Sequence, residues 1–300
     1  MYESTSATAA HPDPTRDIAH GLAARLRERF KSSDFTPPTL PEAALRLLAM
    51  ARDSAEVSIP NVVSLLESDP VLAARVFQIA QSPLYGTGAP LRSLRAAVVR
   101  LGLNTLRNII LEVSLNMRVF NHKEFARTMA SLQRHSQVTA YAMRKLSRHI
   151  GLDPEFAFLC GLMHDVGIAG ALLEVAEWSA EERDAYGDPE TFTQAIAEIH
   201  EEVGGVLARA WGLPFEVEMV VSNHHVPISG VKSTCPITAV CVTEHLATIC
   251  GAPIENLGGH ARFEYTSPAL FHEACWALGL SEEDLSAFED DVQAIASAIA

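Results

Sequence analysis

Apolar residues recur along most of this chain at the three- and four-residue spacing of an amphipathic helix. Three stripes extend over several turns each: Leu132, His135, Thr139, Ala142 and Leu146; Ile196, His200, Val203 and Leu207; and Leu285, Phe288, Val292, Ile295 and Ile299. No run of alternating apolar and polar residues is long enough to suggest a sheet. The pattern predicts an all-α protein.

Signals for the beginning of a helix agree with these stripes. An Asp precedes a Pro at Asp69-Pro70, Asp153-Pro154 and Asp188-Pro189, which places a side-chain acceptor at the N-cap and Pro at the first helical position. Ser179 and Glu182 have the spacing of a capping box. We therefore expect helices to begin at these four points.

Helix breakers divide the chain into four expected parts. They are a flexible N-terminal tail with a lead-in helix (1–34), an N-terminal helical lobe (35–120), a helical bundle (121–254) and a C-terminal helical extension (255–300). The stretch Gly258-Gly259 precedes the last pair of helices. We expect two packed helical lobes followed by this extension.

Charge and composition narrow the class of partner. Lys and Arg number 23 against 37 Asp and Glu, and the formal net charge of −14 would repel nucleic acid and anionic lipid. The segment from Phe156 to Ala176 imitates a membrane span, but it carries His164-Asp165, and an Asp at the centre of a span costs about 2.5–3.5 kcal/mol. We expect neither nucleic acid nor a membrane as partner, and we expect this polar pair to be buried.

The five cysteines indicate a reducing compartment. They show no Cys-x-x-Cys spacing, and most lie in apolar contexts where a thiol behaves as a small hydrophobic group. The N-terminus lacks a basic stretch followed by an apolar one, which argues against secretion. The expected location is the cytoplasm.

Histidines occur where an apolar core is expected. A lone His on an apolar face is most often a hydrogen-bonded core residue, but here several occur on separate helices. Imidazole nitrogens and a carboxylate from several helices suit a divalent Zn, Mn or Fe ion. We expect six residues to converge in one internal site, either around a metal or as a hydrogen-bond network without one: His135, His164, Asp165, His200, His224 and His225.

Other chemistries have weaker signals. The chain has no Gly-x-Ser-x-Gly elbow, and Gly86-Thr87-Gly88 lacks the Lys and the helix-opening Gly of a phosphate-binding loop, so it is interpreted as a turn. A basic cluster lies on one predicted helix, where a solvated face is favoured over a nucleic-acid surface. Its members are Arg134, Arg144, Lys145 and Arg148.

Short motifs occur in a fixed order between Pro38 and Ala247. They are Leu40-Pro41-Glu42-Ala43, Glu67-Ser68-Asp69-Pro70 with Leu72-Ala73-Ala74-Arg75, Gln81-Ser82-Pro83-Leu84-Tyr85-Gly86, Ala96-Ala97-Val98-Val99-Arg100-Leu101-Gly102, and the run from Phe156 to Gly167 that contains His164-Asp165. This series resembles the HDOD family, the HD-related output domain of bacterial signalling within the HD superfamily. The resemblance implies that the second lobe is an HD-like bundle, and it adds Glu244 as a weaker metal ligand.

Departures from the related HD-GYP phosphodiesterases concern phosphate handling more than metal binding. Ile168 stands where those proteins usually carry Lys, and Val226-Pro227-Ile228-Ser229-Gly230 follows His225 without their Gly-Tyr-Pro signature. His200 and the His224-His225 pair fall where those proteins carry further ligands.

The resemblance favours a signalling module with little or no catalysis that binds a protein partner and a divalent Fe, Mn or Zn ion. The alternative is a metal-dependent phosphohydrolase acting on a nucleotide or cyclic dinucleotide. The sequence leaves open the partner, the oligomeric state and whether the protein is an enzyme.

Overall fold

Helices make up all the regular structure that is described. The computed structural model describes residues 14–42, 44–46, 58–82, 84–85, 90–226, 234–257 and 266–299. Across these ranges there is no strand, and the helices are α1 (Pro14–Lys31), α3 (Ile59–Glu67), α4 (Pro70–Ala80), α5 (Leu94–Leu101), α6 (Leu103–Arg118), α7 (Ala126–Ile150), α8 (Pro154–Met163), α9 (Val166–Ala176), α10 (Ala180–Asp184), α11 (Pro189–Ala210), α12 (Phe215–Val221), α13 (Pro236–Ile249), α14 (Pro268–Leu278) and α15 (Glu282–Ala298). The prediction of an all-α protein is confirmed.

The predicted helix starts are present. Asp69, Asp153 and Asp188 each accept hydrogen bonds from backbone N–H groups in the first turn of α4, α8 and α11, and Pro is the first residue of all three helices. Ser179 and Glu182 form the predicted capping box at α10. Each cap satisfies donors that a helix cannot satisfy within itself, so these short motifs place the helix ends without help from tertiary contacts.

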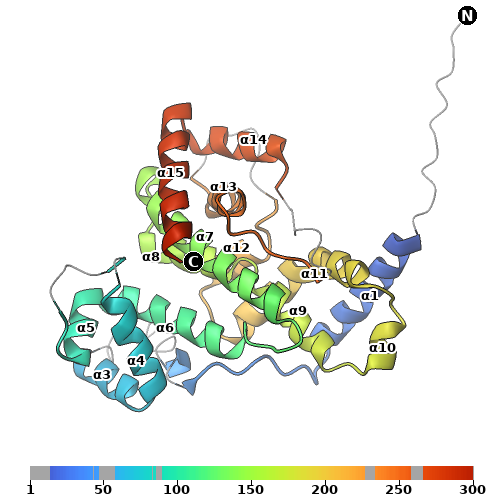
Figure 1. Ribbon diagram of the computed structural model, residues 1–300, viewed down its shortest axis with the longest axis horizontal. Coiled ribbons are helices and arrows are strands. Elements are labelled where there is room, and N and C mark those ends of the chain that lie inside the picture. The colour runs from blue at the N-terminus through green and yellow to red at the C-terminus, as the bar shows by residue number, and fades with distance from the viewer. Residues whose placement is uncertain are drawn as a thin grey trace, which may run out of the picture.

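The helices form two packed groups, as Figure 1 shows. Helices α3, α4, α5 and α6 lie together in one group, and in the other α7 packs on α8 while α9 packs on α11. Helix α6 also contacts α8, and α1 packs along α11. The two packed lobes are confirmed, whereas the four residue ranges given for the domains stay predictions. Residues 1–13, the Gly86-Thr87-Gly88 turn and Gly258-Gly259 lie outside the described residues.

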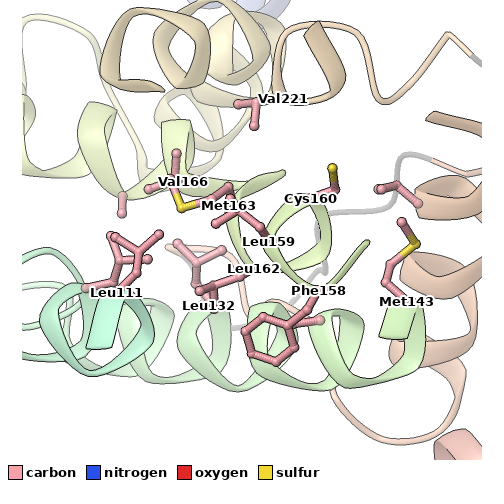
Figure 2. Packing of buried hydrophobic residues seen from close by; sticks show 14 of the residues in the cluster. Leu111, Leu132, Met143, Phe158, Leu159, Cys160, Leu162, Met163, Val166 and Val221 are labelled. Atoms are coloured by element: carbon pink, nitrogen blue, oxygen red, sulfur yellow. The ribbon is translucent and has the colours of Figure 1, made fainter. Parts of the chain in front are cut away.

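The segment that imitates a membrane span forms the centre of the core. Pro154–Ala176 is the one segment of the described residues that is long and apolar enough to cross a membrane, and 89% of its most apolar window is buried inside the protein. Figure 2 shows Phe158 and Leu162 of α8 beside Leu132 of α7. Each such side chain stabilises the fold by about 1.5–3 kcal/mol when it is fully buried.

A glycine lets α8 approach α7 closely. A Cβ on Gly161 would lie 2.8 Å from both the Cα of Ala140 and the carbonyl oxygen of Thr139. Only a residue without a side chain fits such a contact. The close packing brings the C-terminal end of α8, and therefore His164, towards the face of α7 that carries His135.

The basic cluster on α7 is not a uniformly solvated face. The Arg144 side chain is only 12% exposed, donates to Glu155 at 2.9 Å and lies over the ring of Phe158, with 4.1 Å from its Cζ to the ring centroid. It also donates to the hydroxyl of Tyr85, in the segment before α5. The prediction of a solvated face is wrong for Arg144, because an acidic partner and aromatic rings from other elements compensate the burial of its charge.

Candidate metal centre

All the predicted metal ligands except Glu244 come from several different elements and converge in one place. His135 lies on α7, His164 and Asp165 form the junction between α8 and α9, His200 lies on α11, and His224 and His225 lie in the turn after α12. All are buried except His225, which is partly exposed. We call these six residues the metal centre.

Asp165 lies in the middle of the metal centre and directs its two carboxylate oxygens to different histidines. Its Oδ2 lies 3.1 Å from Nε2 of His164 and 3.9 Å from Nε2 of His135. Its Oδ1 lies 3.2 Å from Nε2 of His224 and 3.6 Å from Nε2 of His200. The potential ligand atoms therefore form two compact groups, each within 4.8 Å, that share Asp165.

His225 and Glu244 extend one of these groups towards α13. Nε2 of His225 lies 2.9 Å from Nε2 of His200, and its Nδ1 lies 3.9 Å from Oε2 of Glu244. His225 belongs to the compact group with Asp165, whereas Glu244 belongs to neither group. The structure thus places Glu244 beside the metal centre.

Backbone carbonyl groups set the orientation of four imidazole rings. In each of them Nδ1 lies 2.7–2.9 Å from a carbonyl oxygen, and for three rings this carbonyl belongs to the residue three positions earlier. The pairs are His135 with Ala252, His164 with Gly161, His200 with Ala197, and His224 with Val221. Because a carbonyl oxygen only accepts, Nδ1 carries the proton, and a neutral ring then presents the lone pair of Nε2 to the interior.

Some of the inward-facing atoms have no hydrogen-bond partner. They are Nε2 of His135, Nε2 of His164 and Oδ2 of Asp165, and all three are buried. The last two lie 3.1 Å apart and form an ion pair when His164 is protonated. An unsatisfied buried polar group costs about 1–3 kcal/mol. A divalent cation would pair with all three atoms, and imidazole nitrogen with carboxylate oxygen suits Zn, Mn or Fe. The residues fit a metal.

The pKa values of the centre follow from burial and from Asp165. Burial lowers the pKa of His135 and of His200 to about 4, so both rings are neutral at pH 7. Burial also acts to lower the pKa of His164, but the Asp165 carboxylate outweighs it and raises this pKa to about 9. The pKa of Asp165 lies well below its usual range despite burial, because of its contacts with His164 and His224. The anion and the neutral rings are the ligand forms that metals bind, and His164 would release its proton on binding.

Glu201 supports the metal centre and was missed by the sequence analysis. Its Oε1 accepts a hydrogen bond from the backbone N–H of His225 at 3.1 Å and lies 3.8 Å from Nδ1 of His224. It thereby ties the pair of histidines after α12 to α11. The signal in the sequence that could have identified Glu201 was its position directly after His200, a candidate ligand.

Comparison with known proteins places the chain in a family. The model of the HDOD domain matches residues 38–227, more than half of the chain. A solved structure from Shewanella amazonensis SB2B has the provisional name metal-dependent phosphohydrolase and is 22% identical in sequence, with a TM-score of 0.71. The match covers 95% of this chain and 100% of that one. An HDOD domain protein of unknown function from Geobacter sulfurreducens is 25% identical with a TM-score of 0.64 and coverage of 93% and 98%.

A relative of known sequence is longer than this chain. An uncharacterized protein of Treponema pallidum (strain Nichols) is 25% identical over an alignment of 214 residues that covers 68% of this chain and 40% of that protein. The chain therefore spans less than half the length of that relative. The matched HDOD range contains all six residues of the metal centre, whereas Glu244 lies beyond it. The chain belongs to the HDOD domain family, as its ordered motifs indicated.

Proposed function

We propose that this protein is a signalling output module that binds another protein and carries one or two divalent transition-metal ions, with little or no turnover. The observation that carries the metal part of this proposal is the shared carboxylate of Asp165, which faces two histidine groups with its two oxygens. Such a centre joins α7, α9 and α11 and the segment after α12. It is suited to hold helices in one arrangement.

Each half of the centre would hold a metal with a different set of side chains. His135, His164 and Oδ2 of Asp165 form one set, and His200, His224 and Oδ1 of Asp165 form the other, with His225 beside it. Bound ions would supply positive charge and Lewis acidity. The carbonyl groups on Nδ1 keep the rings oriented, and burial excludes bulk water from them.

Low catalytic power is supported by the residue at position 168 and by the ion pairs of Asp165 among the described residues. Ile168 is fully buried in α9 and carries no charge. Within the described ranges every ion pair of Asp165 is with a histidine, and none is with Lys or Arg. Phosphoryl transfer depends on charges that stabilise the reacting phosphate. The segment 227–233, with Lys232, lies outside the described residues.

Binding of a protein partner is supported by exposed apolar side chains on the surface formed by α12 and the residues after it. Phe215 and Met219 are exposed one turn apart on α12, and Val226 is exposed directly after His225. Exposed apolar groups of this kind are typical of protein interfaces. A partner on this surface would lie next to the pair of histidines and would be sensitive to their position.

A cytoplasmic location is proposed on the chemistry of the cysteines. All five are free thiols, and four of them are buried. Unpaired cysteines are typical of a reducing compartment.

Elemental analysis of protein purified without a histidine tag tests the metal proposal. We expect one to two equivalents of Fe, Mn or Zn per chain, and a loss of most of this metal in Asp165→Asn, because both halves share that carboxylate. His149→Ala is the matched control, since His149 is half-exposed and lies at the end of α7 away from the centre. A metal content that Asp165→Asn leaves unchanged would contradict the proposed ligands.

A metal-dependent phosphohydrolase is the second candidate, and the bridging position of Asp165 favours it. Centres with two metals that share a ligand are common among enzymes that cleave phosphate esters. Metal-loaded protein should therefore be assayed against cyclic dinucleotides and nucleoside phosphates. Turnover of about 1 s⁻¹ or faster that disappears in His164→Ala would replace the signalling proposal with this one.

A further inference from the structure

A polar cavity lies between the two helical groups, on the other side of α7 from the metal centre. Its volume is about 560 Å³, and α4, α6 and α7 supply most of its lining. Gln133 and Gln137 face it, and each stands two positions from His135. Two residues turn a helix by about 200°, so α7 presents His135 and these glutamines on opposite faces.

Uncharged hydrogen-bonding groups dominate the lining of this polar cavity. Five side chains carry carboxamides: Gln78, Asn116, Asn121, Gln133 and Gln137. Arg75 adds one exposed cation from α4, and Ser82 adds a hydroxyl from the segment that the sequence motifs singled out. Carboxamides both donate and accept, so the lining complements a ligand with a polar edge.

Glu112 is the buried acid of the polar cavity. Its side chain is almost wholly enclosed, with 3% of the residue exposed, and its Oε1 accepts a hydrogen bond from Gln137 at 2.7 Å. Its Oε2 is buried and has no partner with the geometry of a hydrogen bond, although the hydroxyl of Tyr141 lies near the carboxyl group. Asn116 lies one turn further along the same face of α6, and its Oδ1 is also buried without a partner. A ligand with N–H or O–H groups would satisfy both of these neighbouring acceptors.

The charges around Glu112 allow it to act as an acceptor. Burial raises the pKa of Glu112 to about 7, against the hydrogen bond from Gln137, the positive charge of Arg144 and the nearby hydroxyl of Tyr141. Tyr141 of α7 and Tyr85 also face it, and burial raises the pKa of both phenols, so neither adds negative charge. A ligand that donates to Glu112 would favour its ionised form near neutral pH.

We propose that this cavity binds a planar group with two adjacent N–H donors, as found in a guanine base or a guanidinium group. A carboxylate has the acceptor geometry for such a pair of donors, and the surrounding carboxamides can pair with the rest of a planar polar edge. Arg75 would face a phosphate or carboxylate attached to this group. The volume falls within the range of small-molecule sites. This site is separate from the metal centre and extends the proposed function with a small-molecule input.

Titration calorimetry with GMP and with arginine tests the proposal, and AMP is the comparison ligand because adenine lacks the adjacent pair of N–H donors. We expect saturable one-to-one binding of GMP, arginine or both, and weaker or no binding of AMP. GMP alone would identify a guanine ligand, and arginine alone would identify a guanidinium ligand. No binding of either at concentrations up to about 1 mM would overturn the proposal, with water as the occupant of the cavity.

Variants connect this binding to Glu112. Glu112→Gln replaces one acceptor oxygen by a donor, and we expect it to weaken binding by about 10- to 100-fold, the effect of a lost hydrogen bond to a charged group. Glu177→Gln, an exposed acid at the end of α9, is the control that should bind as the unaltered protein does. Equal affinity in Glu112→Gln would overturn the proposal.

Folding and metal content are controlled separately. If circular dichroism shows that Glu112→Gln does not fold, Asn116→Ala is used in its place, because it removes the second acceptor. We expect Asn116→Ala to weaken binding, and unchanged binding would overturn the proposal. The titration is repeated after removal of metal by a chelator. Binding should persist there, because α7 separates the polar cavity from the metal centre, so this result is independent of the proposed metal function.

Discussion

The backbone of Gly167 lies so close to His200 that a Cβ on residue 167 would fall 1.8 Å from the carbonyl oxygen of His200. This contact holds the first turn of α9 against the middle of α11. Gly167 has no positive φ, so glycine is needed here for space and not for an unusual backbone conformation. The same contact keeps Asp165, two residues earlier, within reach of the ring of His200.

Replacement of Gly167 should separate the two helices. We expect Gly167→Ala to lower the free energy of unfolding by about 2 kcal/mol or more, because overpacking against a backbone atom forces α9 to move. Metal content should fall as well, since Asp165 moves with α9. Urea unfolding and elemental analysis measure the two effects.

Gly21 provides the matched control for that substitution. It lies within α1, and a Cβ there would meet nothing within 4 Å. We expect Gly21→Ala to raise the free energy of unfolding by about 0.5–1 kcal/mol through helix propensity. A Gly167→Ala variant with the stability of Gly21→Ala would show that α9 and α11 do not pack as closely as described.

Metal removal should destabilise the fold. A chelator is expected to lower the melting temperature, and added Fe, Mn or Zn should restore it, because a ligand at 100 times its dissociation constant stabilises the folded state by about 2.7 kcal/mol. Thermal unfolding with and without the chelator measures the effect. The Asp165→Asn variant should lose this response and His149→Ala should keep it. A response that is equal in both variants would place the stabilising metal elsewhere.

Ionisation of Glu112 should make stability depend on pH. Its pKa is raised from the ordinary 4.5 to about 7 in the folded protein, so its contribution to stability is present below pH 4.5 and is lost as the pH rises through 7. The loss amounts to at most about 3 kcal/mol. Glu112→Gln cannot ionise, and its stability relative to the unaltered protein should therefore increase from pH 5 to pH 8. Urea unfolding at the two pH values measures this difference, and a difference that does not change with pH would contradict it.

The buried ion pair of Arg144 with Glu155 should contribute more to stability than the exposed pair formed by the next residue of α7. Glu155 also accepts hydrogen bonds from Thr105 and Asn108 of α6, so removal of Arg144 leaves a carboxylate that links α6 to α8 without its cation. The two side chains are 12% and 19% exposed. We expect Arg144→Met to lower the free energy of unfolding by about 3 kcal/mol.

Lys145 with Asp291 is the neighbouring pair for comparison, and its side chains are 49% and 41% exposed. Lys145→Met should cost about 0.2–1 kcal/mol, because solvent screens an exposed pair. Chemical denaturation of the two variants in parallel measures both. Equal losses would mean that Arg144 is not held as a buried charge.

The helices themselves could be predicted from the sequence, because the physics that forms them is local. Asp69, Asp153 and Asp188 cap helices that begin one residue later, and the stripe from Leu132 to Leu146 is buried along its whole length. Capping and helical periodicity depend on residues only a few positions apart. The same periodicity, interrupted by His135 and His200, identified two members of the candidate site.

Tertiary structure alone decided which residues meet, because contacts between distant residues depend on how helices pack. The sequence predicts one site for His135, His200 and Asp165, but only the packing of α7, α9 and α11 shows that Asp165 divides its two oxygens between the two histidines. In the sequence Arg144 is one of several basic residues on the same helix, and its burial depends on Glu155 from another helix. Glu112 likewise becomes an enclosed acid only when α4 and α7 close over α6, because burial in a cavity is a property of several elements together.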